Sequence, residues 1–172
     1  MKYSHAGIDL IKTMESCALK AYADQGGVWT IGWGHTGPEV KAGLVWTQAQ
    51  ADAALMADLD SRAAPLRAAI TGVLGDNQFS ALLSLGYNIG IANLTSSTAL
   101  RHCNEAKLAD VPAAILLWNK SKINGVLQVN YGLAGRRAAE CALWHLPDDA
   151  PLPLPDWNAI RKAAVDAARP SV

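Results

Sequence analysis

The chain has 172 residues, 51% of them hydrophobic and 17% charged. That length predicts one domain with a core large enough to fold without a structural metal or disulfide, and every apolar run falls well short of the roughly 18 residues of a membrane helix. Fifteen Lys and Arg balance fifteen Asp and Glu, and the sequence has no dense basic stripe, so nucleic acid is excluded as the main partner.

The first predicted helix starts after Ser4, whose hydroxyl suits an N-cap. Ile8 and Ile11 lie three residues apart on one face of this helix, and the next position on that face is Glu15. A carboxyl group on the inward face of a helix costs free energy unless it is paired or neutralised. Glu15 is therefore the first candidate functional residue.

Residues 19–46 favour β-structure. The segment "DQGG" predicts a turn that begins at Asp24 and uses two glycines. The following "VWTIGW" alternates as a strand does, with Thr30 on the face opposite Trp29 and Ile31. A second turn in "HTGPEVKAG" completes a small β-hairpin or three-stranded sheet.

Helices are predicted after this sheet. Thr47 and Gln50 fit a capping box, and Pro65 should kink or restart the long helix that follows. Asp76 is the expected cap of a central buried helix, "NQFSALLSLGYNIG". The long helix carries one apolar stripe, formed by Ala51, Leu55, Leu59, Ala63, Leu66 and Ile70. Further helices are expected over 96–107, 110–120 and 133–146.

The last segment, residues 147–172, is a proline-rich connector, "PDDAPLPLP", followed by an amphipathic helix. Trp157, Ile160, Ala164 and Ala167 share one face of that helix. Two interpretations are open: the helix packs back on the domain, or residues 156–169 make a weak contact with a membrane or cell wall.

Glu15, Asp24 and Thr30 together suit hydrolysis of a glycosidic bond, which needs a carboxylic acid to protonate the leaving oxygen and a second carboxylate opposite it. Partial burial would favour the protonated form of Glu15, whereas Asp24, in a solvated turn, would stay ionised. Thr30 could help to orient a water held by Asp24. The alternative is structural, because Asp is a frequent turn former and Thr a good strand residue.

The ordered spacing of these three residues, followed by "IGWGHTG", resembles the active-site signature of phage-type lysozymes, the glycoside hydrolase family 24 endolysins. The segments "FSALLSLGYNIG" (79–90) and "GLAGRRAAECALW" (132–144) are similar to the central and late helices of that family. The resemblance implies an α+β, mainly α fold with two lobes. It also implies cleavage of the β-1,4 bond between N-acetylmuramic acid and N-acetylglucosamine in peptidoglycan, with Glu15 as general acid and Asp24 and Thr30 placing the water. Inversion at the anomeric carbon is the expected outcome, and a covalent route through Asp24 stays open because the sequence does not give the distance between the two carboxyl groups.

The expected division is a catalytic domain over residues 1–146. It comprises a small lobe at about 14–46, a connecting helix at about 47–70 and a helical lobe at about 71–146, on which the first helix packs. Residues 147–172 lie outside the resemblance. The loop "SKINGVLQVNYG" (121–132) departs from the glycine and proline pattern of the family, which puts substrate contacts there in doubt.

Three further residues are candidates for substrate binding: Asn88, Arg137 and His35. Asn88 could offer its amide to the sugar, although it could equally end a helix. One of Arg136 and Arg137 is expected to pair with Glu15 and the other to face solvent, and the sequence leaves open which one faces the cleft. His35 is expected mainly as a structural histidine of the small lobe.

The cysteines indicate neither a zinc site nor redox chemistry, because Cys17, Cys103 and Cys141 form no CxxC pair. They are expected to be small buried apolar residues, and a Cys103–Cys141 bridge stays open.

The hypothesis is a monomeric enzyme without cofactor or metal, whose partner is the peptidoglycan glycan strand. The N-terminal residues have no secretory signal pattern, so we expect the enzyme in the host cytoplasm until a holin releases it to the periplasm and cell wall. Two alternatives are a non-catalytic peptidoglycan-binding module and a lytic transglycosylase that forms 1,6-anhydro products.

Overall fold

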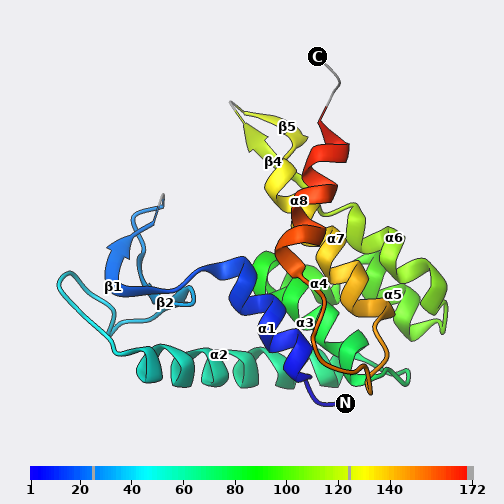
Figure 1. Ribbon diagram of the computed structural model, residues 1–172, viewed down its shortest axis with the longest axis horizontal. Helices are drawn as coiled ribbons and strands as arrows, with labels where there is room; N and C mark the ends of the chain where they lie inside the picture. The colour runs from blue at the N-terminus through cyan, green and yellow to red at the C-terminus, as the bar shows by residue number, and fades with distance from the viewer. Residues whose placement is uncertain (25, 124, 170–172) are drawn as a thin grey trace.

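The computed structural model describes residues 1–24, 26–123 and 125–169. Its helices and two small antiparallel sheets form an α+β, mainly α fold, as the sequence predicted. Helix α2 (Gln48–Ala69) connects a small lobe, which contains a three-stranded sheet, to a larger lobe of packed helices (Figure 1). The N-terminus lies beside the helical lobe, so the chain enters that lobe before it forms the small one.

Helix α1 (His5–Glu15) confirms the predicted N-cap, because Ser4 Oγ accepts a hydrogen bond of 3.0 Å from Gly7 N. Its inner face buries Leu10 and Ile11 and packs against helices α3 (Asp76–Ile89) and α7 (Tyr131–His145). Close packing explains Gly7, where an added Cβ would lie 2.3 Å from Ser80 Cβ. Because α1 belongs to the helical lobe, its last residue, Glu15, lies where the chain crosses to the small lobe.

The small lobe is the predicted three-stranded sheet, formed by β1 (Ala18–Ala23), β2 (Trp29–Gly32) and β3 (His35–Thr36) in sequence order. Antiparallel pairing sets Tyr22 opposite Thr30 and Ile31 opposite His35. The lobe has a small core of its own, formed by Ala21, Ile31 and Val40.

Helix α2 confirms the predicted capping box, with Thr47 Oγ1 and Gln50 Oε1 each accepting from the other residue's backbone N–H. Its whole predicted stripe is buried. A restart at Pro65 is wrong, because α2 is continuous through that residue. Pro65 lies on the exposed face between buried Ala63 and Leu66, whose packing offsets the one backbone hydrogen bond that proline cannot donate.

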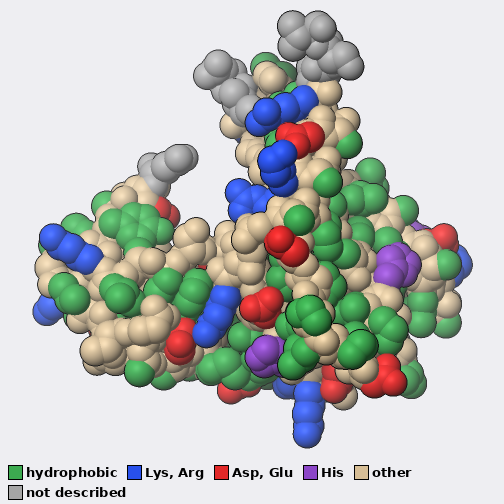
Figure 2. Space-filling model, in the orientation of Figure 1, with side chains coloured by type: hydrophobic (Ala, Val, Ile, Leu, Met, Phe, Trp, Pro, Cys, Tyr) green, Lys and Arg blue, Asp and Glu red, His purple; other side chains and the backbone are tan. Residues whose placement is uncertain are grey.

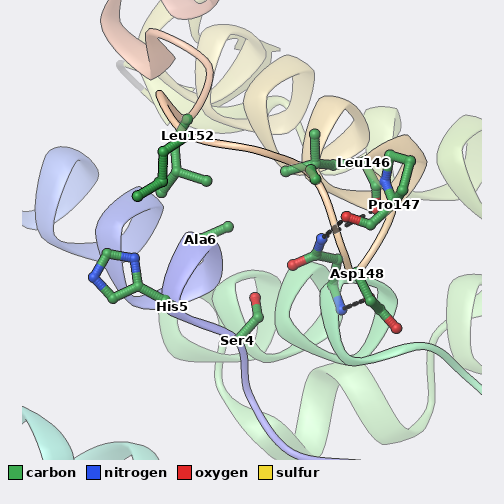
Figure 3. Close-up of a pocket in the computed structure, with 10 residues that line it drawn as sticks. Ser4, His5, Ala6, Leu146, Pro147, Asp148 and Leu152 are labelled. Carbon is green, nitrogen blue, oxygen red and sulfur yellow. Dashed lines mark hydrogen bonds between the residues drawn. The ribbon is translucent and has the colours of Figure 1, made fainter.

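Helix α3 (Asp76–Ile89) is the predicted central helix, but Asp76 is not its cap. Gly75 occupies the N-cap position, and the side-chain cap comes from Asp148 in the proline-rich connector. The Asp148 carboxylate accepts from Asp76 N at 2.8 Å and from Asn77 N at 2.7 Å. Figure 3 shows Asp148 at this position, with its hydrogen bond from the start of α3. A Cβ at Gly75 would lie 2.7 Å from Asp148 Oδ2, so this distant cap requires a residue without a side chain.

The later helices differ from those predicted: the helices expected over 96–107 and 110–120 are shorter, whereas the one expected over 133–146 begins two residues earlier and ends one residue earlier. They are α4 (Ile91–Thr95), α5 (Thr98–Asn104), a 3₁₀ turn over Leu108–Asp110, α6 (Val111–Leu116) and α7 (Tyr131–His145). The expected helix over 110–120 and the loop over 121–132 are corrected. The strands β4 (Lys120–Ile123) and β5 (Val126–Val129) pair as a hairpin where the end of that helix and most of that loop were expected. The segment "VLQV" favours a strand because it contains two β-branched valines and follows a glycine.

Helix α8 (Trp157–Ala168) packs against α7, which confirms the interpretation that the last helix returns to the domain. Trp157 is 2% exposed and donates from Nε1 to Asp9 Oδ2 at 2.9 Å. Ala167, expected on the inner face, is exposed. Over the described ranges, no helix is both long enough and apolar enough to cross a bilayer.

The three cysteines are free thiols. The Cys103–Cys141 bridge, which the sequence left open, therefore does not form. Cys103 is buried, whereas Cys17 and Cys141 are half-buried. Burial raises the pKa of Cys103 to about 11 and that of Cys141 to about 12, which keeps both thiols protonated and unreactive.

Candidate active site

Glu15 ends helix α1, and its carboxyl group lies between the two lobes. Its side chain is 19% exposed, and Oε1 accepts a hydrogen bond of 2.5 Å from Nη1 of Arg136 on helix α7. The other oxygen, Oε2, lies 3.7 Å from the position of a Cβ on Gly34 in the small lobe. The expected pairing of Glu15 with one of the two arginines is thus confirmed, and Arg136 is that arginine.

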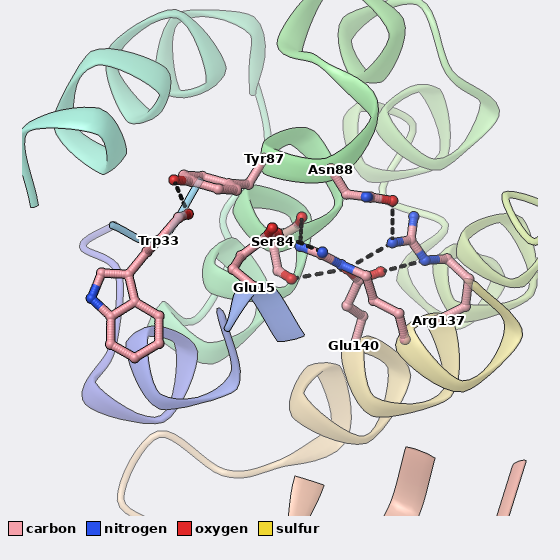
Figure 4. A network of polar contacts seen from close by, with 8 residues as sticks. Glu15, Trp33, Ser84, Tyr87, Asn88, Arg137 and Glu140 are labelled. Atoms are coloured by element: carbon pink, nitrogen blue, oxygen red, sulfur yellow. Dashed lines mark hydrogen bonds and ion pairs between the residues drawn. The ribbon is translucent and has the colours of Figure 1, made fainter. Parts of the chain in front are cut away.

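A buried polar network around Glu140 and Ser84 (Figure 4) holds Arg136 in place. Glu140, which is fully buried, accepts at Oε1 from Arg136 Nε at 3.2 Å and from Ser84 Oγ at 2.9 Å. Arg136 Nη2 also donates to the Ser84 carbonyl at 3.2 Å. Helices α3 and α7 therefore fix the guanidinium group that positions Glu15.

The charges of this network balance, with two carboxylates, Glu15 and Glu140, against two guanidinium groups, Arg136 and Arg137. Burial alone would lower the pKa of Arg136, but the charges of Glu140 and Glu15 outweigh it and raise that pKa. Arg136 therefore stays charged, and Glu15 lies against a cation rather than in the apolar surroundings that its helix face predicted.

The sequence led us to expect that the second arginine faces solvent or the cleft. Arg137 faces neither. It is fully buried, with Nη2 donating to Glu140 Oε1 at 3.2 Å and to Asn88 Oδ1 at 2.9 Å. Its Nε lies 3.0 Å from Glu140 Oε2, an ion pair without hydrogen-bond alignment. The expected direct contact of Arg137 with substrate is therefore wrong. Arg137 instead holds the side chain of Asn88, which is exposed.

Asp24 and Thr30 are brought together in the small lobe through Val28. The Val28 carbonyl accepts from Asp24 N at 2.9 Å and from Thr30 Oγ1 at 3.1 Å. Asp24 Oδ1 accepts from the amides of Gly26 and Val28, both at 2.8 Å, as expected of a turn former. Asp24 is exposed, and its Oδ2 accepts no hydrogen bond from the residues that the structure describes, so this oxygen is available to a water.

His35 joins the small lobe to α2. Its Nδ1 lies 2.9 Å from Asp58 Oδ2, and its Nε2 lies 2.7 Å from Glu39 Oε1. Burial opposes the charged ring, but the hydrogen bonds to Glu39 and Asp58 outweigh it and raise the pKa of His35. Since both ring nitrogens are occupied, the structural interpretation is confirmed and the expected role in substrate binding is corrected.

Two further polar contacts join the lobes, and sequence reasoning missed both. Tyr87 Oη donates to the Trp33 carbonyl at 3.0 Å, and Trp33 Nε1 donates to Asp52 Oδ1 at 2.8 Å. Lys12 pairs with the same oxygen of Asp52 at 2.8 Å. The sequence signal for Tyr87 was a residue with a polar hydroxyl next to Asn88 in an otherwise apolar helix.

Sequence reasoning also missed the burial of Ser84 and Glu140. Its only sequence signal was a polar residue within an apolar helix.

A pocket of about 240 Å³ lies beside this network. It is lined by Met14, Asn88, Asn130, Gly132, Leu133, Arg136 and Arg161. Figure 2 shows a broad hollow between the small lobe and the projecting part of the helical lobe. Among the described residues, no group of three or more His, Cys, Asp or Glu is arranged to hold a metal ion. The Glu15 carboxyl group from one lobe and the exposed Asp24 carboxylate from the other are groups that can carry out acid–base chemistry.

Known proteins share this architecture. A family model described as phage lysozyme matches residues 12–140. The chain is 40% identical over 144 residues to an endolysin of Acyrthosiphon pisum secondary endosymbiont phage 1, covering 84% of this chain and 98% of that protein. It is 39% identical to an endolysin of Bacillus phage PZA, of which it spans 55%. The muramidase domain of SpmX from Asticaccaulis excentricus superposes with a TM-score of 0.80 at 36% identity, covering 85% of this chain and 99% of that chain.

Proposed function

The chain belongs to the phage lysozyme family, and from that membership we propose that it is an endolysin whose Glu15, Asp24 and Thr30 cleave peptidoglycan. The bond is the β-1,4 linkage between N-acetylmuramic acid and N-acetylglucosamine. The chain is accordingly a glycoside hydrolase of the lysozyme type, a muramidase.

The observation that carries the proposal is the position of Glu15. Arg136 holds one carboxyl oxygen, while the other lies beside Gly34 at the junction of the lobes. A strand of glycan between the lobes would present its glycosidic oxygen to Glu15, which donates the proton that the leaving sugar needs. Arg136 acts through Glu15 as a positioning residue.

Asp24 and Thr30 act from the other lobe. Asp24 uses Oδ1 to hold its turn and keeps Oδ2 for the attacking water. Thr30 donates its hydroxyl hydrogen bond to the Val28 carbonyl, so its Oγ1 helps to place that water by accepting a hydrogen bond from it. This division of roles predicts attack from the face opposite Glu15 and therefore inversion at the anomeric carbon.

The deciding experiment is mass spectrometry of the muropeptides that the protein releases from purified peptidoglycan. Reducing N-acetylmuramic acid ends are expected; 1,6-anhydro ends would instead identify a lytic transglycosylase. Replacing Glu15 by Gln should lower the rate of release at least about 100-fold, the usual contribution of a general acid.

Glu105→Gln is the matched control, because it neutralises a carboxylate on the far surface that pairs with Lys107. It should release muropeptides at the wild-type rate. Equal release by wild type and Glu15→Gln would remove Glu15 as the acid. Tight binding of peptidoglycan with no release by either protein would identify a binding module.

We further propose that the enzyme acts as a monomer and reaches the periplasm and cell wall from the cytoplasm when a membrane-permeabilising partner such as a holin opens the inner membrane. Expression in Escherichia coli with and without a holin tests this route. Lysis should require the holin, and lysis at the same time without it would contradict the proposal.

The proposed weak membrane contact of residues 156–169 is restricted by the packing of α8, whose apolar face is turned to the protein. Any contact must use the polar face, which bears Lys162 and Arg169. Co-sedimentation with anionic vesicles at low salt tests it, because a contact of this kind weakens as ionic strength rises.

A further inference from the structure

Helix α8 lies outside the residues that match the family, 12–140, yet it contributes to the site. Arg161 on α8 lines the same pocket as Asn88 and Arg136. Arg136 is the residue that holds Glu15. The last helix therefore forms part of the wall beside the proposed general acid.

Close packing fixes the aliphatic part of Arg161. A Cβ on Gly135 of α7 would lie 2.7 Å from Arg161 Cγ and 2.8 Å from the Arg161 carbonyl oxygen. The buried Trp157, one turn earlier, anchors the start of α8 through its hydrogen bond to Asp9. Because its backbone and first methylenes are held in this way, the guanidinium group has a restricted range of positions at the pocket.

Arg161 forms no ion pair with any residue that the structure describes. Glu15 and Glu140 neutralise Arg136 and Arg137, and Lys162 pairs with Asp166 at 2.8 Å. Within the described part of the chain, by contrast, no carboxylate oxygen lies within 4.0 Å of a nitrogen of Arg161. Figure 2 shows Lys and Arg side chains gathered over the projecting part of the helical lobe, beside the hollow.

We propose that Arg161 binds a carboxylate of the peptide that peptidoglycan carries on N-acetylmuramic acid, an inference that rests on the proposed function. This stem peptide branches from a sugar of the scissile bond and bears free carboxylates, which arginine binds with two parallel hydrogen bonds. The neighbouring Asn88 suits the same peptide. Arg137 holds its Oδ1, which leaves the Nδ2 group to donate to a peptide carbonyl.

The experiment compares two substrates, purified peptidoglycan and the same peptidoglycan after its carboxylates have been converted to amides. Arg161→Met, which keeps the packed stem but not the charge, should lower kcat/KM on native peptidoglycan about tenfold, mainly through KM. Wild type should lose about the same factor on the amidated substrate, where Arg161→Met should lose little more. Arg161→Lys should recover part of the activity.

Lys162→Met is the matched control, since it removes one positive charge from the next residue of α8, on its solvent side. It should leave both rates and their ratio unchanged, and all variants should keep the wild-type melting temperature. Wild-type kcat/KM for Arg161→Met on native peptidoglycan would overturn the inference, as would an equal loss on both substrates. Failure of wild type to cleave either substrate would overturn the proposed function, and the inference with it.

Discussion

The small lobe buries only a minor core of three apolar side chains, whereas the helical lobe buries one large cluster that includes α1, α3 and α7. Polar contacts to α2 and α3 hold the small lobe in position, through His35, Trp33 and Tyr87. In the helical lobe the polar contacts lie inside the core, around Glu140. The two lobes thus use polar groups for different purposes.

This difference matters for the proposed mechanism, because each lobe supplies one side of the reaction. Glu15 is positioned by a rigid, buried network in the helical lobe. Asp24 and Thr30 are positioned by a turn and a strand in the lobe with the smaller core. We therefore expect changes in the helical lobe to affect the stability of the whole protein, and changes in the small lobe to affect mainly the placement of the water.

Glu140→Gln should have the largest effect on stability. It leaves two buried guanidinium groups, those of Arg136 and Arg137, and a single carboxylate, that of Glu15, to neutralise them. The free energy of unfolding should therefore fall by about 3–5 kcal/mol. Urea denaturation followed by circular dichroism measures this change. Activity should fall as well, because Arg136 would no longer be fixed against Glu15.

Glu105→Gln is the control, because Glu105 pairs with Lys107 on the surface of the same lobe. Its unfolding midpoint should match that of wild type. A loss of similar size in both variants would show that the buried network contributes no more than a surface pair.

Ile31→Ala should have the next largest effect, about 2–3 kcal/mol, because Ile31 is the largest of the three buried side chains that form the small core. The loss should be local. Hydrogen exchange should show lower protection in β1–β3 and unchanged protection in α3.

The matched change in the other lobe is Leu82→Ala, at a fully buried position of α3. It should lower protection throughout the protein. If both variants lowered protection equally in the two lobes, the lobes would form a single cooperative unit and the comparison would fail.

Features that depend on residues close in sequence were predicted well. Ser4, the Thr47 capping box and the turn at Asp24 each involve contacts within four residues, and the sequence contains all the partners. The apolar stripe of α2 was also predicted, because helical periodicity alone selects it. Membership of the family and the likeness of Glu15, Asp24 and Thr30 to its signature came from ordered spacing, which is likewise visible in one dimension.

Features that depend on distant partners were not predicted. The cap of α3 comes from Asp148, which is 72 residues from Asp76, and the burial of Glu140 depends on Ser84, which is 56 residues away. Arg136 and Arg137 are adjacent and chemically identical, so only the packing of α7 on α3 distinguishes the arginine that reaches Glu15. Periodicity identifies a face of a helix but not the element that covers it.

Asp148→Ala should cost about 1 kcal/mol, the usual value of a helix cap. It removes the acceptor for two backbone N–H groups of α3 and loosens the connector that leads to α8. Differential scanning calorimetry measures the fall in melting temperature. Asp149→Ala is the control, and an equal fall in both variants would assign the effect to charge rather than to capping.

The smallest expected effect is the pH dependence that His35 gives to the small lobe. The pKa of His35 is raised in the folded protein, through Glu39 and Asp58. A raised folded pKa means that the contribution is fully present below the ordinary histidine value of about 6.5 and is lost as pH rises through the folded value. Arg62, which lies 3.6 Å from Asp58 Oδ1, keeps that carboxylate partly neutralised and limits the size of the effect.

His35→Gln should therefore lower protection of the β1–β3 amides more at pH 5.5 than at pH 8.5, with exchange rates corrected for their intrinsic pH dependence. Protection of α3 should not change with the substitution at either pH. A larger loss at pH 8.5 would mean that the neutral ring is the form that holds the lobe. A loss in α3 of the same size would mean that His35 stabilises the whole fold, and that the two lobes do not differ in the way their polar contacts suggest.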